Sequence, residues 1–173
     1  HPRVRRQRQM CIRDSYEAQK NFEGYMPLGR VSKEVLKKVY NVMCAYEETM
    51  YRVELHSIMS QMDEFIRYAN KYWSSHIKEA DQEGSEELRC QTLIDSFYLL
   101  RIATLLMHPI VPRGTEKICD FMNFDFDEFF SWNYDFDSME ELCNAHELEA
   151  KRHRVRDLPP RTDFFSFHPS QKK

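Results

Sequence analysis

Apolar side chains recur every three or four residues along three long stretches of the chain, which is the spacing of one buried face of an α-helix. The first stretch follows Ser32 and the third follows Ser85, and a serine hydroxyl can cap a helix by accepting from free backbone N–H groups. The second begins near Val53, and the polar segment 76–84 is expected to end it. The third runs to about Met107 and is the most apolar, so we expect it to be the central helix. The positions expected to face the core are Leu36, Val39, Tyr40, Met43, Tyr46 and Met50; Leu55, Ile58, Met59, Met62, Phe65, Ile66, Ala69, Tyr72 and Trp73; and Leu93, Ile94, Phe97, Leu100, Ala103, Leu106 and Met107.

A short fourth helix is expected beyond these three. Pro109 ends the third helix, because proline lacks the backbone N–H that a helix interior needs. The segment 112–114 is expected to form a second bend, after which Thr115 caps the fourth helix. The inward-facing residues of this helix are Ile118, Phe121 and Met122. The pattern therefore predicts an all-α fold, an antiparallel helical bundle of four to five helices.

The C-terminal part is expected to be an irregular extension with one helix and a proline-rich tail. Residues 124–142 contain seven acidic and seven aromatic residues and no lysine or arginine, so they predict an acidic and aromatic flap that covers the bundle and repels phosphate. Ser138 and Glu141 have the spacing of a capping box, which predicts a fifth helix after them. Pro159 and Pro160 then force an extended tail.

Charge divides the chain into unequal parts. Residues 1–15 contain five arginines and one aspartate, a net charge of +4, and because the whole chain carries −3, the remaining residues carry −7. Clustered arginines can bind nucleic-acid phosphates, but this segment also resembles translated sequencing-adapter sequence, and we expect it to be non-native. The rest is predicted to divide into a connector over 16–31, a helical bundle over 32–123 and an extension over 124–173.

Composition excludes several classes of protein. The chain has only four glycines, which argues against a β-sandwich or barrel with its frequent turns. No apolar run reaches the roughly 20 residues that a membrane-spanning helix needs. The five cysteines are odd in number and form no C-x-x-C pair, which indicates a reducing compartment. We therefore expect a soluble, cytoplasmic protein without a membrane partner.

The motifs that usually carry catalysis or bind metals do not occur in the sequence. There is no P-loop, no G-x-G-x-x-G and no G-x-S-x-G. No histidine follows a glutamate at the Glu-x-x-His spacing of di-iron bundles. Cys143 and His146 are spaced like half of a zinc site, but there is no second half, and a helix face explains the pair better. The sequence predicts no catalytic residue, no metal site and no cofactor in this chain.

Two motifs in and after the predicted second and third helices resemble those of a known family. The first is Ala-Asn-Lys-Tyr at 69–72, near the end of the second helix. The second is the turn Met-His-Pro-Ile-Val-Pro at 107–112, which matches more loosely a Leu-x-Pro-(apolar)-(apolar)-Pro pattern. In this order they resemble the C-terminal anticodon-binding helical domain of the methionyl-tRNA synthetases, class I tRNA ligases, over residues 22–123. The tail at 158–171 also resembles the end of a bacterial branch of class I tRNA ligases.

This resemblance implies a longer parent enzyme, which would activate methionine with ATP, often with zinc in its catalytic domain, and transfer it to tRNA. HIGH-type and KMSKS-type motifs of such a catalytic domain do not occur in the 173 residues. We therefore expect a non-catalytic C-terminal fragment whose partners are the anticodon of the methionine tRNA and the missing N-terminal catalytic domain. The chain departs from the family where Pro-Trp usually follows the first motif, because Lys78 and Glu79 stand there.

The resemblance places candidate RNA-binding residues at the end of the second helix, namely Asn70, Lys71, Trp73, His76 and Lys78. Trp73 shares a helix face with Asn70, so its ring either stacks on an unpaired base or extends the apolar stripe into the core. Asn70 either binds a base edge or caps the end of its own helix. Lys71, His76 and Lys78 are expected at the helix end and in the following loop, where they contact phosphate or remain solvated.

Three residues in and just after the third predicted helix are expected to have structural roles. Arg101 lies inside the most apolar helix and is expected to pair with a buried acid, because an unpaired buried charge is costly. His108 and Arg113 flank the bend after that helix and are expected to be structural.

The alternative to an RNA-binding role is a helical protein-interaction domain, which the charge of −7 over residues 16–173 favours.

Overall fold

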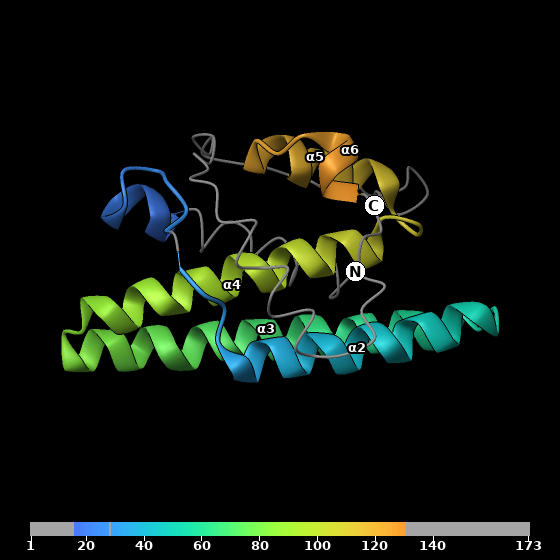
Figure 1. Ribbon diagram of the computed structural model, residues 1–173, viewed down its shortest axis with the longest axis horizontal. Helices are drawn as coiled ribbons and strands as arrows, with labels where there is room; N and C mark the ends of the chain where they lie inside the picture. Colours follow the sequence, from blue (N-terminus) through green and yellow to red (C-terminus); the bar gives the residue numbers. More distant parts are fainter. Residues whose placement is uncertain (1–15, 28, 131–173) are drawn as a thin grey trace, which may run out of the picture.

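The computed structural model describes residues 16–27 and 29–130, which fold into helices joined by short connections (Figure 1). After the helical residues 16–21, the elements are α2 (Lys33–Tyr51), α3 (Leu55–Glu83), α4 (Glu86–Met107), α5 (Pro112–Met122) and α6 (Phe126–Phe130). The predicted all-α helical bundle is confirmed.

The helix α4 is the centre of the bundle, as its apolar sequence predicts. It packs against α2, α3, α5 and α6, and Figure 1 shows α2 and α3 on one side of it and α5 and α6 over its C-terminal half on the other. By length and composition α4 could cross a membrane, but 78% of its most apolar window is buried inside the bundle. Such burial is typical of the core helix of a folded domain.

The two predicted serine caps are confirmed. The Ser32 Oγ accepts from the Val35 N–H at 3.4 Å, and the Ser85 Oγ accepts from the Leu88 N–H at 3.2 Å. Each cap satisfies one of the N–H groups that the first turn of a helix leaves without a partner. The starts of α2 and α4 therefore follow from local sequence alone.

The second predicted helix ends within the predicted polar segment 76–84, but only at the end of that segment, because α3 continues to Glu83. The segment contains Ala80, which is fully buried, so this last part of α3 still packs against the bundle. Arg89 of α4 forms ion pairs with Asp81 of α3 and with Glu17. Gly84 then ends the helix at φ 63°, a left-handed conformation that glycine adopts without strain.

Two further corrections concern the chain after α4. The predicted bend at 112–114 is the first turn of α5, since proline at the first helical position has its φ already set for a helix. Thr115 is therefore not a cap, and its buried hydroxyl donates back toward the carbonyls of Val111 and Pro112. The start of the predicted irregular flap forms the helix α6, and Phe129 of this helix is buried, as expected for a covering ring. The remainder of the flap, the predicted fifth helix and the tail lie outside the described residues.

Candidate functional site

A buried carboxylate connects three parts of the chain beside the Ala-Asn-Lys-Tyr motif. Asp95 of α4 is fully buried, and its Oδ2 accepts from the Tyr72 hydroxyl of α3 at 2.5 Å. Its Oδ1 accepts from the Ser32 backbone N–H at 2.8 Å and from the Gln91 side-chain amide at 3.1 Å. The motif's tyrosine is therefore a structural residue that fixes α3 against α4 and the start of α2. Sequence reasoning missed this role, although an acid inside the most apolar stripe could have indicated it.

The same contact changes the acidity of Tyr72. Burial, followed by the hydrogen bond to Asp95, raises the pKa of the Tyr72 hydroxyl well above its usual value. The hydroxyl therefore stays protonated and keeps donating to Asp95 at neutral pH.

Trp73 does not lie where an RNA base could reach it. Its side chain is only 5% exposed and belongs to the hydrophobic core. An aromatic ring stacks on a base only when one of its faces is accessible. The base-stacking prediction for Trp73 is therefore wrong, and the alternative, in which the ring extends the stripe of Ile66 and Ala69, is what the structure shows.

Asn70 and His76 are partly buried and both bond to carbonyls of α3. The Asn70 side-chain amide donates to the Ile66 carbonyl at 2.8 Å, and because α3 continues well beyond this residue, Asn70 does not cap the helix end. The His76 Nδ1 lies 2.8 Å from the Tyr72 carbonyl, and its ring stacks on the Tyr72 ring with centroids 4.0 Å apart. His76 therefore lies within the helix, whereas it was predicted at the helix end or in the following loop.

Lys71 and Lys78 are exposed, and they lie within α3 instead of at its end or in a loop. Residues seven apart are two helical turns apart and point to the same side, so the two ammonium groups share a face with Ser74 and with Arg67. We name Arg67, Lys71, Ser74 and Lys78 the α3 polar face. Arg67 pairs with Asp63 of the same helix at 2.5 Å. Of the predicted RNA-binding residues, the structure brings Lys71 and Lys78 together on an exposed surface and buries Trp73.

The second motif forms a tight turn that attaches α5 and α6 to the end of α4. The His108 Nδ1 lies 2.8 Å from the Thr115 Oγ1, and the His108 ring stacks on Phe130 with centroids 3.9 Å apart. These contacts agree with the structural role expected of His108. Arg101 lies with its guanidinium carbon 5.7 Å from the centroid of Phe124 and 5.8 Å from that of Phe129, so its contacts include cation–π interactions with the start of the extension.

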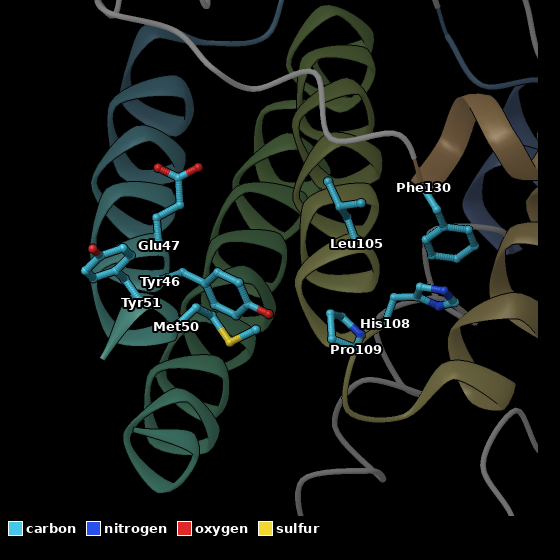
Figure 2. Close-up of a pocket in the computed structure, with 8 residues that line it drawn as sticks. All are labelled: Tyr46, Glu47, Met50, Tyr51, Leu105, His108, Pro109 and Phe130. Atoms are coloured by element: carbon cyan, nitrogen blue, oxygen red, sulfur yellow. The ribbon is translucent and has the colours of Figure 1, made fainter. Parts of the chain in front are cut away.

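An open groove of about 630 Å³ lies between the ends of α2 and α4 and helix α6 (Figure 2). Tyr51 in its wall is 91% exposed, and Phe126 is 48% exposed beside the groove residue Phe130. Val53, in the turn after α2, and Leu55, the first residue of α3, are also exposed, although Leu55 was predicted to face the core. The groove is lined by Tyr46, Glu47, Met50, Tyr51, Leu105, His108, Pro109 and Phe130. Sequence reasoning missed it, because its walls meet only in the folded bundle.

The described residues contain no group of three or more His, Cys, Asp or Glu side chains that could hold a metal ion. Cys143 and His146, the pair with half of a zinc spacing, lie outside those residues. Burial raises the pKa of the Cys119 thiol to about 11, so this cysteine is a protonated core residue at neutral pH.

Comparison with known proteins supports the resemblance that the two motifs predict. No protein-family model matches the chain. The chain is 24% identical over 147 residues to the methionine–tRNA ligase of Bacillus cereus (strain Q1), a match that covers 81% of this chain. It is 24% identical over 100 residues to the methionine–tRNA ligase of Korarchaeum cryptofilum (strain OPF8), a match that covers 56% of this chain. The chain spans only 26% and 18% of the lengths of these two relatives.

Solved structures of a methionyl-tRNA synthetase have the same fold in part of their length. The apo form of the Mycobacterium tuberculosis enzyme matches with a TM-score of 0.69 at 19% identity, over 93% of this chain and 32% of that one. The same enzyme bound by methionyl-adenylate matches with a TM-score of 0.65 at 19% identity, over 91% of this chain and 30% of that one. The predicted resemblance to part of a methionyl-tRNA synthetase is therefore confirmed.

Proposed function

We propose that this chain is the tRNA-binding helical part of an aminoacyl-tRNA synthetase similar to the methionine–tRNA ligases, and that it recognises the anticodon of the methionine tRNA. The parent enzyme would activate methionine with ATP, often with zinc in its catalytic domain, in a part of the protein other than the described bundle. Such an enzyme would act in the cytoplasm, where its tRNA is found.

One observation carries this proposal. Each of the two motifs on which the family resemblance rests supplies a contact that joins helices of the bundle. The tyrosine of the first motif bonds Asp95, and His108 of the second contacts Thr115 and Phe130. These framework contacts hold the α3 polar face in place, and the proposed function is carried by that surface.

The proposed RNA contacts lie on the α3 polar face. Lys71 and Lys78 would contact phosphates, because an exposed ammonium group on a flexible stem binds a phosphate as a point charge. Asn70 and His76 each bond the carbonyl one turn earlier on α3, and they would contact the RNA at the edge of that face. Trp73 supports the face from the core.

Binding of anticodon stem-loops by the purified chain tests the proposal. Fluorescence anisotropy would compare a stem-loop carrying the CAU anticodon with one of equal length in which the three anticodon bases are permuted. We expect the CAU stem-loop to bind at least tenfold more tightly, because specific contacts to unpaired bases discriminate by about 1 to 3 kcal/mol. Equal affinity for the two RNAs would contradict anticodon recognition.

A second function is favoured by the apolar groove. Exposed apolar patches on a folded domain often mark binding surfaces, and the exposed Tyr51 lines the groove while the exposed Phe126 packs against its residue Phe130. A helical protein-interaction domain would use this surface and would not need RNA. Two results together would favour this second function. The chain would bind neither stem-loop, and it would bind a protein partner through a surface that includes Tyr51.

A further inference from the structure

We propose that the phosphate backbone of the tRNA lies along the seam between the start of α2 and the middle of α3, and that lysines of α2 contact this backbone together with those of α3. This inference rests on the proposed function and names a binding surface for it. We define the seam as Lys33, Lys37 and Lys38 of α2 together with Lys71 of α3 and Arg67 beside it.

The seam is the place where positive charge concentrates. Residues 33–38 contain three lysines and one glutamate, and residues 67–78 contain two lysines, one arginine and no acid. Among these side chains Lys33, Lys37 and Lys71 are exposed, and Lys38 is half-buried. Each of the two segments therefore offers ammonium groups to solvent on the surface of the bundle.

The fold brings the two segments together. Asp95 bonds both the Ser32 N–H and the Tyr72 hydroxyl, so α2 begins beside the middle of α3. Further along α2, the Lys38 ammonium lies 5.3 Å from the centroid of the Tyr68 ring, within the range of a cation–π contact. Figure 1 shows α2 running alongside α3 from this point. Lys71 is one helical turn from Tyr68, so Lys38 of α2 and Lys71 of α3 both lie close to this ring.

Three other segments of the described chain carry a net negative charge. Formal charges give −2 for residues 47–54, −4 for residues 79–89 and −2 for residues 113–127. Three acids, Glu34, Asp63 and Glu64, belong to the same segments or border them. Burial and, after it, the nearby charge of Glu34 raise the pKa of the Tyr68 hydroxyl, and Asp63 is paired with Arg67. Since phosphates are repelled by net negative surfaces, an RNA that binds the described bundle would do so where lysines of α2 and α3 meet.

The chemistry of the seam fits a backbone, not a base sequence. Lysine ammonium groups bind phosphate oxygens without geometric selection, and each phosphate they neutralise releases counterions. Contacts of this kind strengthen binding of every RNA alike and make the affinity depend on salt. Anticodon discrimination would then come from other contacts, while the seam holds the stem.

Charge reversal on α2 tests the inference in the whole chain. The variant carries Lys37→Glu and Lys38→Glu, and the matched control carries Arg113→Glu and Lys117→Glu, which change the net charge equally on the opposite side of α4. The affinity for the CAU stem-loop is measured by anisotropy over a range of salt concentrations. We expect the α2 variant to lose about tenfold to a hundredfold in affinity near 0.1 M salt and to reduce the slope of log K against log salt by roughly two. The control should lose less than about threefold.

The outcomes separate this inference from the proposed function. The α2 variant should weaken the CAU and permuted stem-loops by the same factor, leaving their ratio as in the wild type. Equal losses in the α2 and control variants, with the CAU preference of the wild type intact, would overturn the seam and leave the proposed function standing. A selective loss in the α2 variant of a chain without CAU preference would support the seam and contradict anticodon reading. Absence of binding by the wild-type chain would overturn both, and far-UV circular dichroism confirms that every variant is folded.

Discussion

Replacing Asp95 with alanine should destabilise the bundle more than any surface change. The substitution removes the acceptor of the Tyr72 hydroxyl and of the Ser32 N–H, and Asp95 itself is fully buried. A buried donor left without its acceptor costs about 1 to 3 kcal/mol, so two such donors predict a loss of about 3 to 5 kcal/mol in the free energy of unfolding. A loss of this size would lower the melting temperature of a domain of this length by on the order of 15 °C.

Thermal and urea unfolding followed by circular dichroism would measure this loss. Asp127→Ala, which removes an exposed carboxylate of α6, is the matched control and should stay within about 0.5 kcal/mol of the wild type. Tyr72→Phe should cost about 1.5 to 3 kcal/mol, because it removes a single hydrogen bond to a charged group. In a double-mutant cycle Tyr72→Phe should cost much less when Asp95 is already alanine. An Asp95→Ala protein that melts with the control would refute the role of the carboxylate as the link between α2, α3 and α4.

Three further outcomes are expected. Trp73→Ala should lower the free energy of unfolding by about 3 to 5 kcal/mol, and Trp73→Phe should lower it much less. A Trp73→Ala protein of normal stability would show that the ring is not a core residue. The pKa of Tyr72 is raised in the folded protein, so the stabilising contribution of its hydroxyl is complete below pH 10.0, the ordinary tyrosine pKa, and is lost as the pH rises above that value. Urea unfolding at a series of pH values should therefore show a flatter alkaline decline of stability for Tyr72→Phe than for the wild type. Lys71→Ala combined with Lys78→Ala should lower the salt dependence of stem-loop binding by about two phosphate contacts, and an unchanged slope would remove these lysines from the RNA surface.

Local signals in the sequence were sufficient for the helix starts. Ser32 and Ser85 act as caps through their own hydroxyls, and the apolar stripes face the core because helical periodicity decides which side is buried. The end of α3 could not be predicted in the same way. Its last turns are polar. They are joined to the bundle by Arg89, which pairs with the nearby Asp81 and with Glu17 from a distant part of the chain.

The candidate site was predicted only in part, for a related reason. Lys71 and Lys78 were expected on an accessible surface, and their exposure follows from being opposite to the apolar stripe. Trp73 could be interpreted as a base-stacking or a core residue, since periodicity places it at the edge of the stripe and only packing decides. Asp95 and the seam depend on which residues of α2 and α4 lie beside α3, and that register is a tertiary property.

Footprinting of the methionine tRNA by the purified chain tests the central claim most directly. Hydroxyl-radical cleavage of the end-labelled tRNA, with and without the chain, reports which sugars the protein covers. The proposed function predicts protection of the anticodon loop and of the adjoining stem backbone, with the acceptor stem cleaved as in free tRNA. Protection confined to the acceptor stem, or a cleavage pattern unchanged at protein concentrations that saturate binding, would contradict it.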